Sequence, residues 1–261
     1  MDWDQLLVGF IAAFVIATVT APVGVSGAVF LLPVQLSVLH VPNPSVTPTN
    51  LLYNVVAGPG ALLSYARRGS LDSPLARRLV LATVPGVVVG AAIRVHVVSG
   101  AGVFRLIAAL VLLAIGCWLI RRTLAPPRLH RPMTDRTVSG LALGVGVIGG
   151  IYGIGGGSII GPILVGSGMT VAVVAPAALL STFAASIVGA VTFSALAWTS
   201  SDPVAPEWPI GLACGVGGLL GGYLGARLQP QLPETVLRLM LGGLAVLIGL
   251  LYAAQSLWSL R

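Results

Sequence analysis

The stretch YGIGGGSIIGP, from Tyr152 to Pro162, places four glycines among its first six residues and lies inside a long apolar run. Glycine destabilises a helix by about 1 kcal/mol per residue relative to alanine. A helix that crosses a membrane depends on its internal backbone hydrogen bonds, so these glycines weaken it where it most needs them. The pattern therefore predicts that the chain breaks at the glycines instead of continuing as one helix.

The composition of the whole chain sets the class of protein. Hydrophobic residues make up 56% of the 261 positions and charged residues only 8%, whereas soluble globular proteins carry about 25% charged residues. We therefore expect an all-α polytopic membrane protein. None of the acidic residues interrupts an apolar run; they are Asp2, Asp4, Asp72, Asp135, Asp202, Glu207 and Glu234.

The apolar residues fall into about eight hydrophobic segments. Most are close to the roughly 20 residues that span a bilayer. The first and the fifth are too long for one crossing and contain glycine, proline and serine, so we expect each to be broken at a glycine-rich tip. The segments lie at about 6–40, 45–66, 75–98, 103–120, 137–165, 171–198, 208–228 and 236–256.

The two halves of the chain resemble each other in sequence. GVSGAVFLLP (Gly24–Pro33) aligns without a gap to GIGGGSIIGP (Gly153–Pro162), and PTNLLYN (Pro48–Asn54) aligns to PAALLST (Pro176–Thr182). Two further blocks follow in the same order, which predicts an internal duplication. We assign residues 1–122 to a first transmembrane repeat, 123–136 to a cytoplasmic linker and 137–261 to a second transmembrane repeat.

Loop charge predicts how the repeats are oriented. The connection after the second segment holds Arg67, Arg68, Arg77 and Arg78, whereas its counterpart, residues 199–208, holds two acids and no basic residue. The positive-inside rule places the first connection in the cytoplasm and the second outside. Segment 137–165 then contributes no crossing or two crossings, which predicts a hairpin of two short arms and inverted repeats. We attribute the net charge of +7 to topology and not to nucleic-acid binding.

The two glycine tips are the first candidate substrate site. A helix N-terminus has bare N–H groups that attract anions, and glycine lets a ligand approach the backbone closely. Close packing of helices through small residues is the alternative interpretation. The candidate residues are Gly155, Gly156, Gly157 and Ser158 in the second half and Gly24, Ser26 and Gly27 in the first.

Polar side chains in the next segment of each half are the second candidate group. Asn50 and Asn54 lie one helical turn apart and share a face, while Ser181 and Thr182 occupy the aligned block of the second half. Hydrogen bonding between helices is the alternative role. Arg94 and Arg227 end aligned segments, and we favour interface anchors over anion attractors for them.

Several motifs are missing from the sequence, which narrows the function. There is no Walker loop, no hydrolase or zinc-ligand pattern, and no acid inside a segment for a proton relay. GIGGGS lacks the acid that a dinucleotide site needs, and the separated Cys117 and Cys214 form no metal motif. We expect no enzymatic activity, no cofactor, no metal and no nucleic-acid partner.

The duplicated signature, GIGGGSIIGPIL with its echo GVSGAVFLLPVQ, resembles that of the sulfite exporter TauE/SafE family of membrane permeases. The resemblance covers nearly the whole chain. It implies a multi-pass transporter in the inner membrane of a bacterium or archaeon that exports sulfite, sulfoacetate or related sulfur anions. Carried over by position, it adds Gly153 to the candidate substrate region.

The sequence therefore predicts a secondary permease in the bacterial inner membrane. It would export a small oxyanion, such as sulfite or an organosulfonate, by alternating access, with membrane lipids as its other partner. The coupling ion and the oligomeric state stay open. A non-transporting scaffold predicts that no cavity exists at the tips, whereas a carrier of a small cation or another metabolite predicts that carbonyl groups face inward there.

Overall fold

The computed structural model describes residues 3–96, 102–124, 133–197 and 205–258. These residues form ten α-helices and two short 3-10 helices, and they contain no strand, so the all-α prediction is confirmed for this part of the chain. The helices are α1 (Trp3–Thr20), η1 (Ala21–Val23), α2 (Ala28–Ser37), α3 (Asn43–Ala66), α4 (Pro74–His96), α5 (Gly102–Leu124), α6 (Asp135–Tyr152), α7 (Gly157–Gly166), α8 (Val171–Ala197), α9 (Trp208–Leu228), η2 (Gln229–Gln231) and α10 (Glu234–Trp258).

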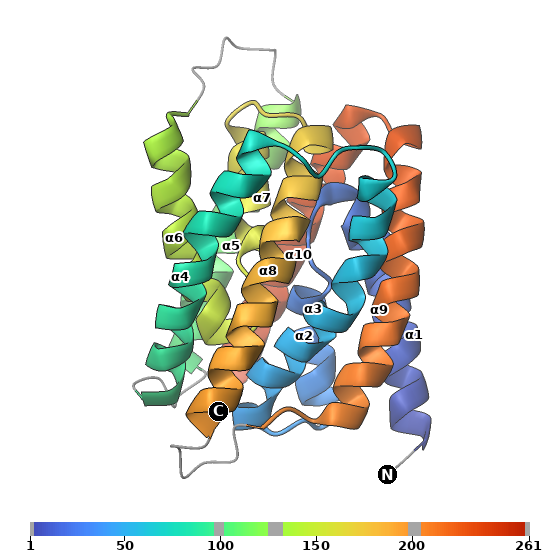
Figure 1. Cartoon of the computed structure of the whole chain (residues 1–261), viewed down its shortest axis with the longest axis vertical. Coiled ribbons are helices and arrows are strands. Elements are labelled where there is room, and N and C mark those ends of the chain that lie inside the picture. Colours follow the sequence, from blue (N-terminus) through green and yellow to red (C-terminus); the bar gives the residue numbers. More distant parts are fainter. Residues whose placement is uncertain (1–2, 97–101, 125–132, 198–204, 259–261) are drawn as a thin grey trace.

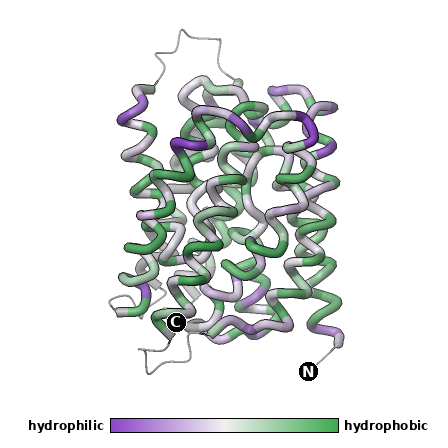
Figure 2. The backbone as a smooth tube through the Cα atoms, in the orientation of Figure 1, coloured by the Kyte–Doolittle hydropathy of each residue, from purple (hydrophilic) through white to green (hydrophobic). Residues whose placement is uncertain are grey.

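Five of the described helices, α1, α4, α8, α9 and α10, are long and apolar enough to cross a membrane. Helices α2 and α7 are apolar but have only ten residues each, about 15 Å of helix against a hydrocarbon core of about 30 Å. Figure 2 shows hydrophobic residues along the middle of the bundle and hydrophilic residues gathered toward its two ends. The chain is a multi-pass membrane protein, and the count of eight segments stays a prediction.

Both glycine-rich breaks reverse the direction of the chain. Figure 1 shows α1 starting at the lower end of the bundle and α2 running back toward that end, while α6 starts at the upper end and α7 runs back toward the upper end. The short arms α2 and α7 therefore begin in the interior of the bundle and extend to opposite faces.

Glycines outside the tips bring neighbouring helices into close contact. Helix α9 packs against α1, and α4 packs against α6. A Cβ atom added at Gly221 of α9 would lie 2.1 Å from the Phe14 carbonyl oxygen, and one added at Gly90 of α4 would lie 2.1 Å from that of Val147. Such approach is the usual packing mode of small residues in membrane helices. For these glycines the packing interpretation is sufficient.

The long helices α3 and α8 form the centre of the bundle. They contact each other, α3 also contacts α9, and α8 also contacts α4, while α5 pairs with α10 at one side. Each short arm packs beside a central helix: α2 against α3, and α7 against α8. This arrangement places the polar side chains of α3 and α8 next to the two glycine tips.

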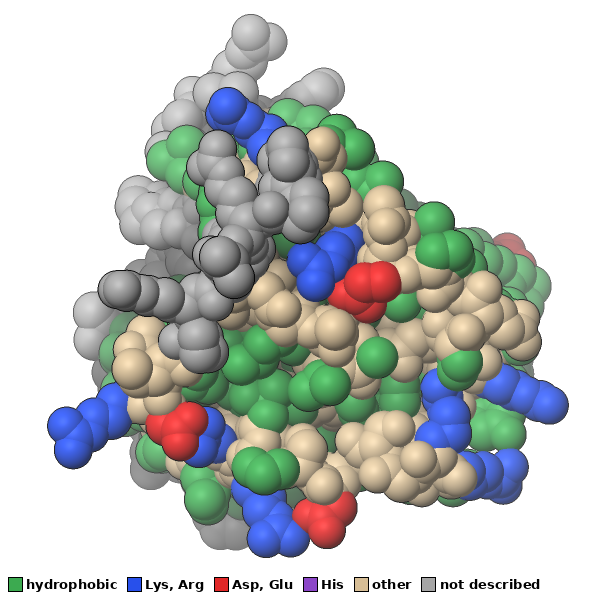
Figure 3. Space-filling model, turned by 90° about the horizontal axis from the view of Figure 1, so that it is seen from above, with side chains coloured by type: hydrophobic (Ala, Val, Ile, Leu, Met, Phe, Trp, Pro, Cys, Tyr) green, Lys and Arg blue, Asp and Glu red, His purple; other side chains and the backbone are tan. Residues whose placement is uncertain are grey.

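Basic side chains gather at the upper end of the bundle. We call this end the arginine face and define it by Arg67, Arg68, Arg77, Arg78 and Arg227, which lie at the ends of α3 and α9 or the start of α4; Figure 3 views it from above. Helices α1, α5 and α9 begin at the opposite face. Most of the predicted linker, at 125–132, and of the acidic loop, at 198–204, lies outside the described residues.

Candidate functional site

Each tip begins where a helix ends at a glycine in the left-handed region. Gly24 follows η1 with φ of 75°, and Gly153 follows α6 with φ of 70°. Glycine adopts this conformation without the steric cost that a Cβ atom imposes, and it commonly ends helices in this way. The helices therefore stop at the glycines because these residues allow the chain to turn back.

The starts of α2 and α7 meet inside the bundle. The backbone N–H of Ser26, two residues before α2, donates to Oγ of Ser158 in the first turn of α7 at 3.0 Å. The hydroxyl of Ser26 donates to Oδ1 of Asn54 at 2.5 Å, and Nδ2 of Asn54 donates to the Gly153 carbonyl oxygen at 3.4 Å. Asn54 thus connects both tips, and the structure brings these predicted residues together.

Thr182 of α8, which aligns with Asn54 of α3, contacts the second tip. Its hydroxyl oxygen accepts a hydrogen bond from the backbone N–H of Gly157 at 3.1 Å. A Cβ atom added at Gly157 would lie 2.2 Å from that oxygen, so a larger residue does not fit there. On the first side, Nδ2 of Asn50 donates to the Ala28 carbonyl oxygen at 3.0 Å.

The tips have unused N–H groups, and only some of their carbonyl groups are bonded: among the hydrogen bonds of the described residues, none ends on the carbonyl oxygen of Val25, Ser26 or Ile154. The carbonyl oxygens of Ala28, Gly153 and Gly155 accept hydrogen bonds. Among the hydrogen bonds of the described residues, none uses the backbone N–H of Gly27, Gly155 or Gly156. Each helix N-terminus also carries roughly half a positive charge from the helix dipole. The region between the tips therefore offers donors and a positive potential.

A cavity of about 30 Å³ lies against the first tip. Its polar lining comes from Thr20, Ser26, Tyr53, Asn54 and Thr182. Thr20 is 2% exposed, and its hydroxyl has no hydrogen-bond partner, which is costly in an apolar interior. A single water needs at least about 10–15 Å³, so the cavity accommodates about two waters and must widen to hold an oxyanion.

Other predicted residues lie away from the meeting point of the tips. Ser181 is hydrogen-bonded to Thr83 at 2.9 Å between their hydroxyl oxygens, in the contact between α8 and α4. Gly24 packs against Ala175, whose Cα would be 2.4 Å from an added Cβ atom. Arg94 lies near the end of α4 at the opposite face, and Arg227 lies at the arginine face.

Sequence reasoning missed two residues that line the cavity. Thr20 is the polar residue just before the first break, and a hydroxyl next to a break in an apolar segment indicates a polar site. Tyr53 lies between the two asparagines of the polar block, and a Cβ atom added at Gly27 would lie 2.3 Å from its hydroxyl oxygen. An aromatic residue in an apolar segment is ordinary, so the sequence carried no comparable signal for Tyr53.

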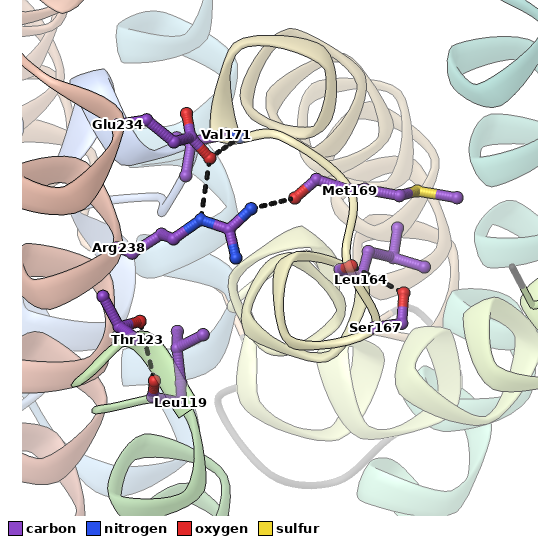
Figure 4. A network of polar contacts seen from close by, with 8 residues as sticks. All are labelled: Leu119, Thr123, Leu164, Ser167, Met169, Val171, Glu234 and Arg238. Carbon is purple, nitrogen blue, oxygen red and sulfur yellow. Dashed lines mark hydrogen bonds and ion pairs between the residues drawn. The ribbon is translucent and has the colours of Figure 1, made fainter. Parts of the chain in front are cut away.

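A polar network fixes the second hairpin at the arginine face (Figure 4). Oε1 of Glu234 accepts a hydrogen bond from the Val171 N–H at the start of α8 and another from Nε of Arg238, each at 2.9 Å. Nη2 of Arg238 donates to the Met169 carbonyl oxygen at 3.2 Å. The loop between α7 and α8 is therefore attached to α10, which holds the arm that carries the second tip.

These features define the class of protein: a multi-pass α-helical membrane protein in which two short arms meet by their N-termini in the interior. The chain belongs to the sulfite exporter TauE/SafE family, whose sequence model matches residues 9–252. This is a family of membrane permeases, so the resemblance predicted from the duplicated signature is confirmed. No curated protein and no solved structure gives a significant match to the chain.

Proposed function

We propose that this permease exports a small sulfur oxyanion, sulfite or an organosulfonate, across the inner membrane of a bacterium. The anion binds between the N-termini of α2 and α7, next to Asn54 and Thr182. Access to this site alternates between the arginine face, which is cytoplasmic, and the opposite face.

The meeting of the two N-termini carries this proposal. Two positive dipole ends that face each other repel, and an anion between them removes the repulsion. The contact of Ser26 with Ser158 at 3.0 Å brings these ends together. No group of three or more potential metal-ligating side chains occurs among the described residues. An anion is therefore the ligand that fits this electrostatic environment.

The alternatives fit these contacts less well. A cation carrier needs free carbonyl oxygens at the tips; those of Gly153 and Gly155 accept hydrogen bonds, whereas those of Val25, Ser26 and Ile154 do not. The positive ends of the two helix dipoles nevertheless favour an anion over a cation. A non-transporting scaffold leaves no space at the tips, but a cavity lies between Ser26 and Thr182. The helix dipoles thus favour an anion, and the cavity favours transport.

The helix pairings support alternating access between inverted repeats. In the predicted duplication, α1 corresponds to α6, α3 to α8 and α4 to α9. If each helix is replaced by its counterpart, the contact of α1 with α9 becomes that of α6 with α4, and the contact of α3 with α9 becomes that of α8 with α4. The pairs α3 with α8 and α5 with α10 map onto themselves. Inverted-repeat transporters bind substrate at the repeat interface near the membrane midplane, often at the ends of broken helices. The positive-inside rule assigns the arginine face to the cytoplasm.

Anion flux into or out of liposomes that contain the purified protein tests this function. Sulfite, sulfoacetate and thiosulfate are assayed with the wild type and with Gly156→Val. Gly156 has φ of 78°, so valine there is strained by about 1–3 kcal/mol and disturbs the second tip. We expect flux of at least one anion in the wild type and a loss in the variant.

Gly144→Val provides a matched control, because Gly144 is exposed and has no atom within 4 Å of its added Cβ position. Flux should stay near the wild-type value in this control. If the wild type moves none of the anions, the proposed function is wrong. If Gly156→Val is folded and moves them as fast as the wild type, the proposed site is wrong.

A further inference from the structure

The cavity at the first tip extends along one side of the bundle toward the arginine face. Beyond Ser26 and Asn54 it is bounded by small residues of three helices that run toward this face. These residues are Ala17 of α1, Ala57 and Ala61 of α3, and Gly218 and Gly222 of α9. Their small side chains leave space between α1, α3 and α9 on the arginine side of the tips.

Arg68 bridges α3 and α9 beyond Ala61 and Gly222, where the lining of the cavity ends. The buried Tyr65 lies between Ala61 and Arg68 along α3, and its hydroxyl donates to the Ala21 carbonyl oxygen at 3.0 Å. The Nη2 atom of Arg68 donates to Oγ of Ser64 at 3.1 Å and also to the carbonyl oxygen of Ala226, one helical turn beyond Gly222. Its Nε atom donates to the Ser64 carbonyl oxygen at 3.2 Å, and the guanidinium lies 4.9 Å from the centre of the Tyr65 ring. These contacts fix the guanidinium and leave Nη1 available.

The arginines at this end of the bundle differ in whether an acid pairs with them. Arg77, Arg78 and Arg238 form ion pairs with Asp72, Asp135 and Glu234 respectively. Within the described part of the chain, no acidic side chain pairs with Arg67, Arg68 or Arg227. Figure 3 shows blue side chains beside red ones over part of this face and blue side chains without red neighbours at one edge. Uncompensated positive charge thus lies where α3 and α9 end, and also at the end of α5 and the start of α6, where Arg121 and Arg136 form no ion pair with a described acid.

We propose that Arg68 is the residue that admits the substrate anion to the cavity from the arginine face. Its fixed guanidinium offers a planar donor group that suits an oxyanion with two or more oxygens. We call the end of the cavity that faces Arg68 the mouth. Arg67 and Arg227 add positive potential around the mouth, and this potential raises the local anion concentration. This inference rests on the proposed function, because it assumes that an anion is bound at the tips.

A cysteine at Ala61 tests the role of Arg68 without requiring transport. Cys117 is replaced by serine and Cys214 by alanine, so the new thiol is the reactive one. Inside-out membrane vesicles are treated with two methanethiosulfonate reagents, one with a sulfonate group and one with a quaternary ammonium group. The ratio of their reaction rates measures how strongly the mouth favours an anion over a cation.

We expect the anionic reagent to be favoured and Arg68→Gln to lower the ratio by roughly fivefold or more, because one charge near the mouth is lost. Arg68→Lys should retain most of the ratio. Arg77→Gln is the matched control, because Arg77 is on the same face and pairs with Asp72 at 2.7 Å; its ratio should be unchanged. Equal ratios in Arg68→Gln and the wild type, or a thiol that reacts with neither reagent, would overturn the proposal.

Flux gives the second readout. In Arg68→Gln we expect the KM for sulfite on the arginine side to rise, with little change in kcat, because the residue acts before the anion reaches the tips. Absence of flux in the wild type contradicts the proposed function, but the thiol ratio still decides the role of Arg68. Normal flux with an unchanged thiol ratio contradicts only the role of Arg68.

Discussion

The two halves of the interior, on either side of the meeting tips, are built differently. On the arginine side, the small residues Ala61, Gly218 and Gly222 bound a cavity. On the opposite side, Leu51, Ala91 and Phe193 form a buried cluster, which we call the apolar plug. Val95, Ala190 and Leu196 pack around this plug.

The difference shows on which side of the tips the interior holds space. Small residues leave room for water, whereas packed apolar side chains exclude water and ions, as in the hydrophobic constrictions of channels. The cavity therefore lies on the arginine side of the tips, where the buried Tyr65 is its boundary toward the face, and the apolar plug closes the opposite side. In an alternating-access cycle, the plug must loosen while the cavity between α3 and α9 closes.

Filling the cavity should have the largest effect on transport. A Cβ atom added at Gly222 would be 3.5 Å from the Ala61 backbone nitrogen, so a methyl group fits there, and the larger side chain of Gly222→Leu extends into the cavity. We expect flux to fall by at least about tenfold, since the substrate path is blocked. Liposome flux measures this, with Gly144→Leu as a control on the outer surface of α6. Wild-type flux in folded Gly222→Leu would contradict the assignment of the cavity.

Emptying the apolar plug should produce the next largest effect. Phe193 is 1% exposed, and removal of a buried phenylalanine side chain costs about 3–5 kcal/mol in protein cores. Phe193→Ala should therefore weaken closure and let anions leak through. The leak is measured as anion flux down a gradient that does not saturate with anion concentration, and as labelling of a cysteine at Ala190 by a reagent added at the opposite face. Unchanged labelling would show that the plug is not a gate.

Loss of the Thr182 hydroxyl should have a moderate effect. Thr182→Val keeps the shape of the side chain but removes the acceptor for the Gly157 N–H, which is worth about 0.5–1.5 kcal/mol. We expect the KM for the anion to rise roughly threefold to tenfold. Thr192→Val is the control, since the Thr192 hydroxyl bonds within its own helix to the Val188 carbonyl oxygen at 2.7 Å. Equal KM values for the two variants would contradict a role for Thr182 at the tip.

The smallest effect is expected at Tyr65, on the arginine side. When the alignment of the polar blocks is continued along α3 and α8, Tyr65 corresponds to Phe193. Tyr65→Phe removes the hydrogen bond from its hydroxyl to the Ala21 carbonyl oxygen at 3.0 Å, at a cost of about 1 kcal/mol. We expect slightly lower thermal stability and nearly normal flux. A loss of flux as large as that of Gly222→Leu would mean that Tyr65 contacts the substrate.

The sequence predicted the breaks in the chain more reliably than the contacts between them. Gly24 and Gly153 mark both breaks because a left-handed backbone conformation is a local property of glycine. The polar character of Asn54 and Thr182 was also visible, because amides and hydroxyl groups are scarce in apolar segments. These signals depend on one short stretch of chain each.

The pairing of side chains could not be predicted in the same way. Helices that are apolar on all sides have no clear hydrophobic face to fix their rotation. Ser181 and Thr182 are adjacent in sequence, yet one lies against α4 and the other at the second tip. The contact of Ser26 with Ser158 joins residues 132 positions apart, and it depends on how both hairpins fold back.

The most direct test of an anion between the tips is a crystal structure with bound selenite, which resembles sulfite and can be located by the anomalous scattering of selenium. We predict a selenium peak between the starts of α2 and α7, within hydrogen-bonding reach of backbone N–H groups at Gly27 or Gly156. A rubidium peak at this position in crystals grown with rubidium salts, with selenite absent from the tips, would contradict the account.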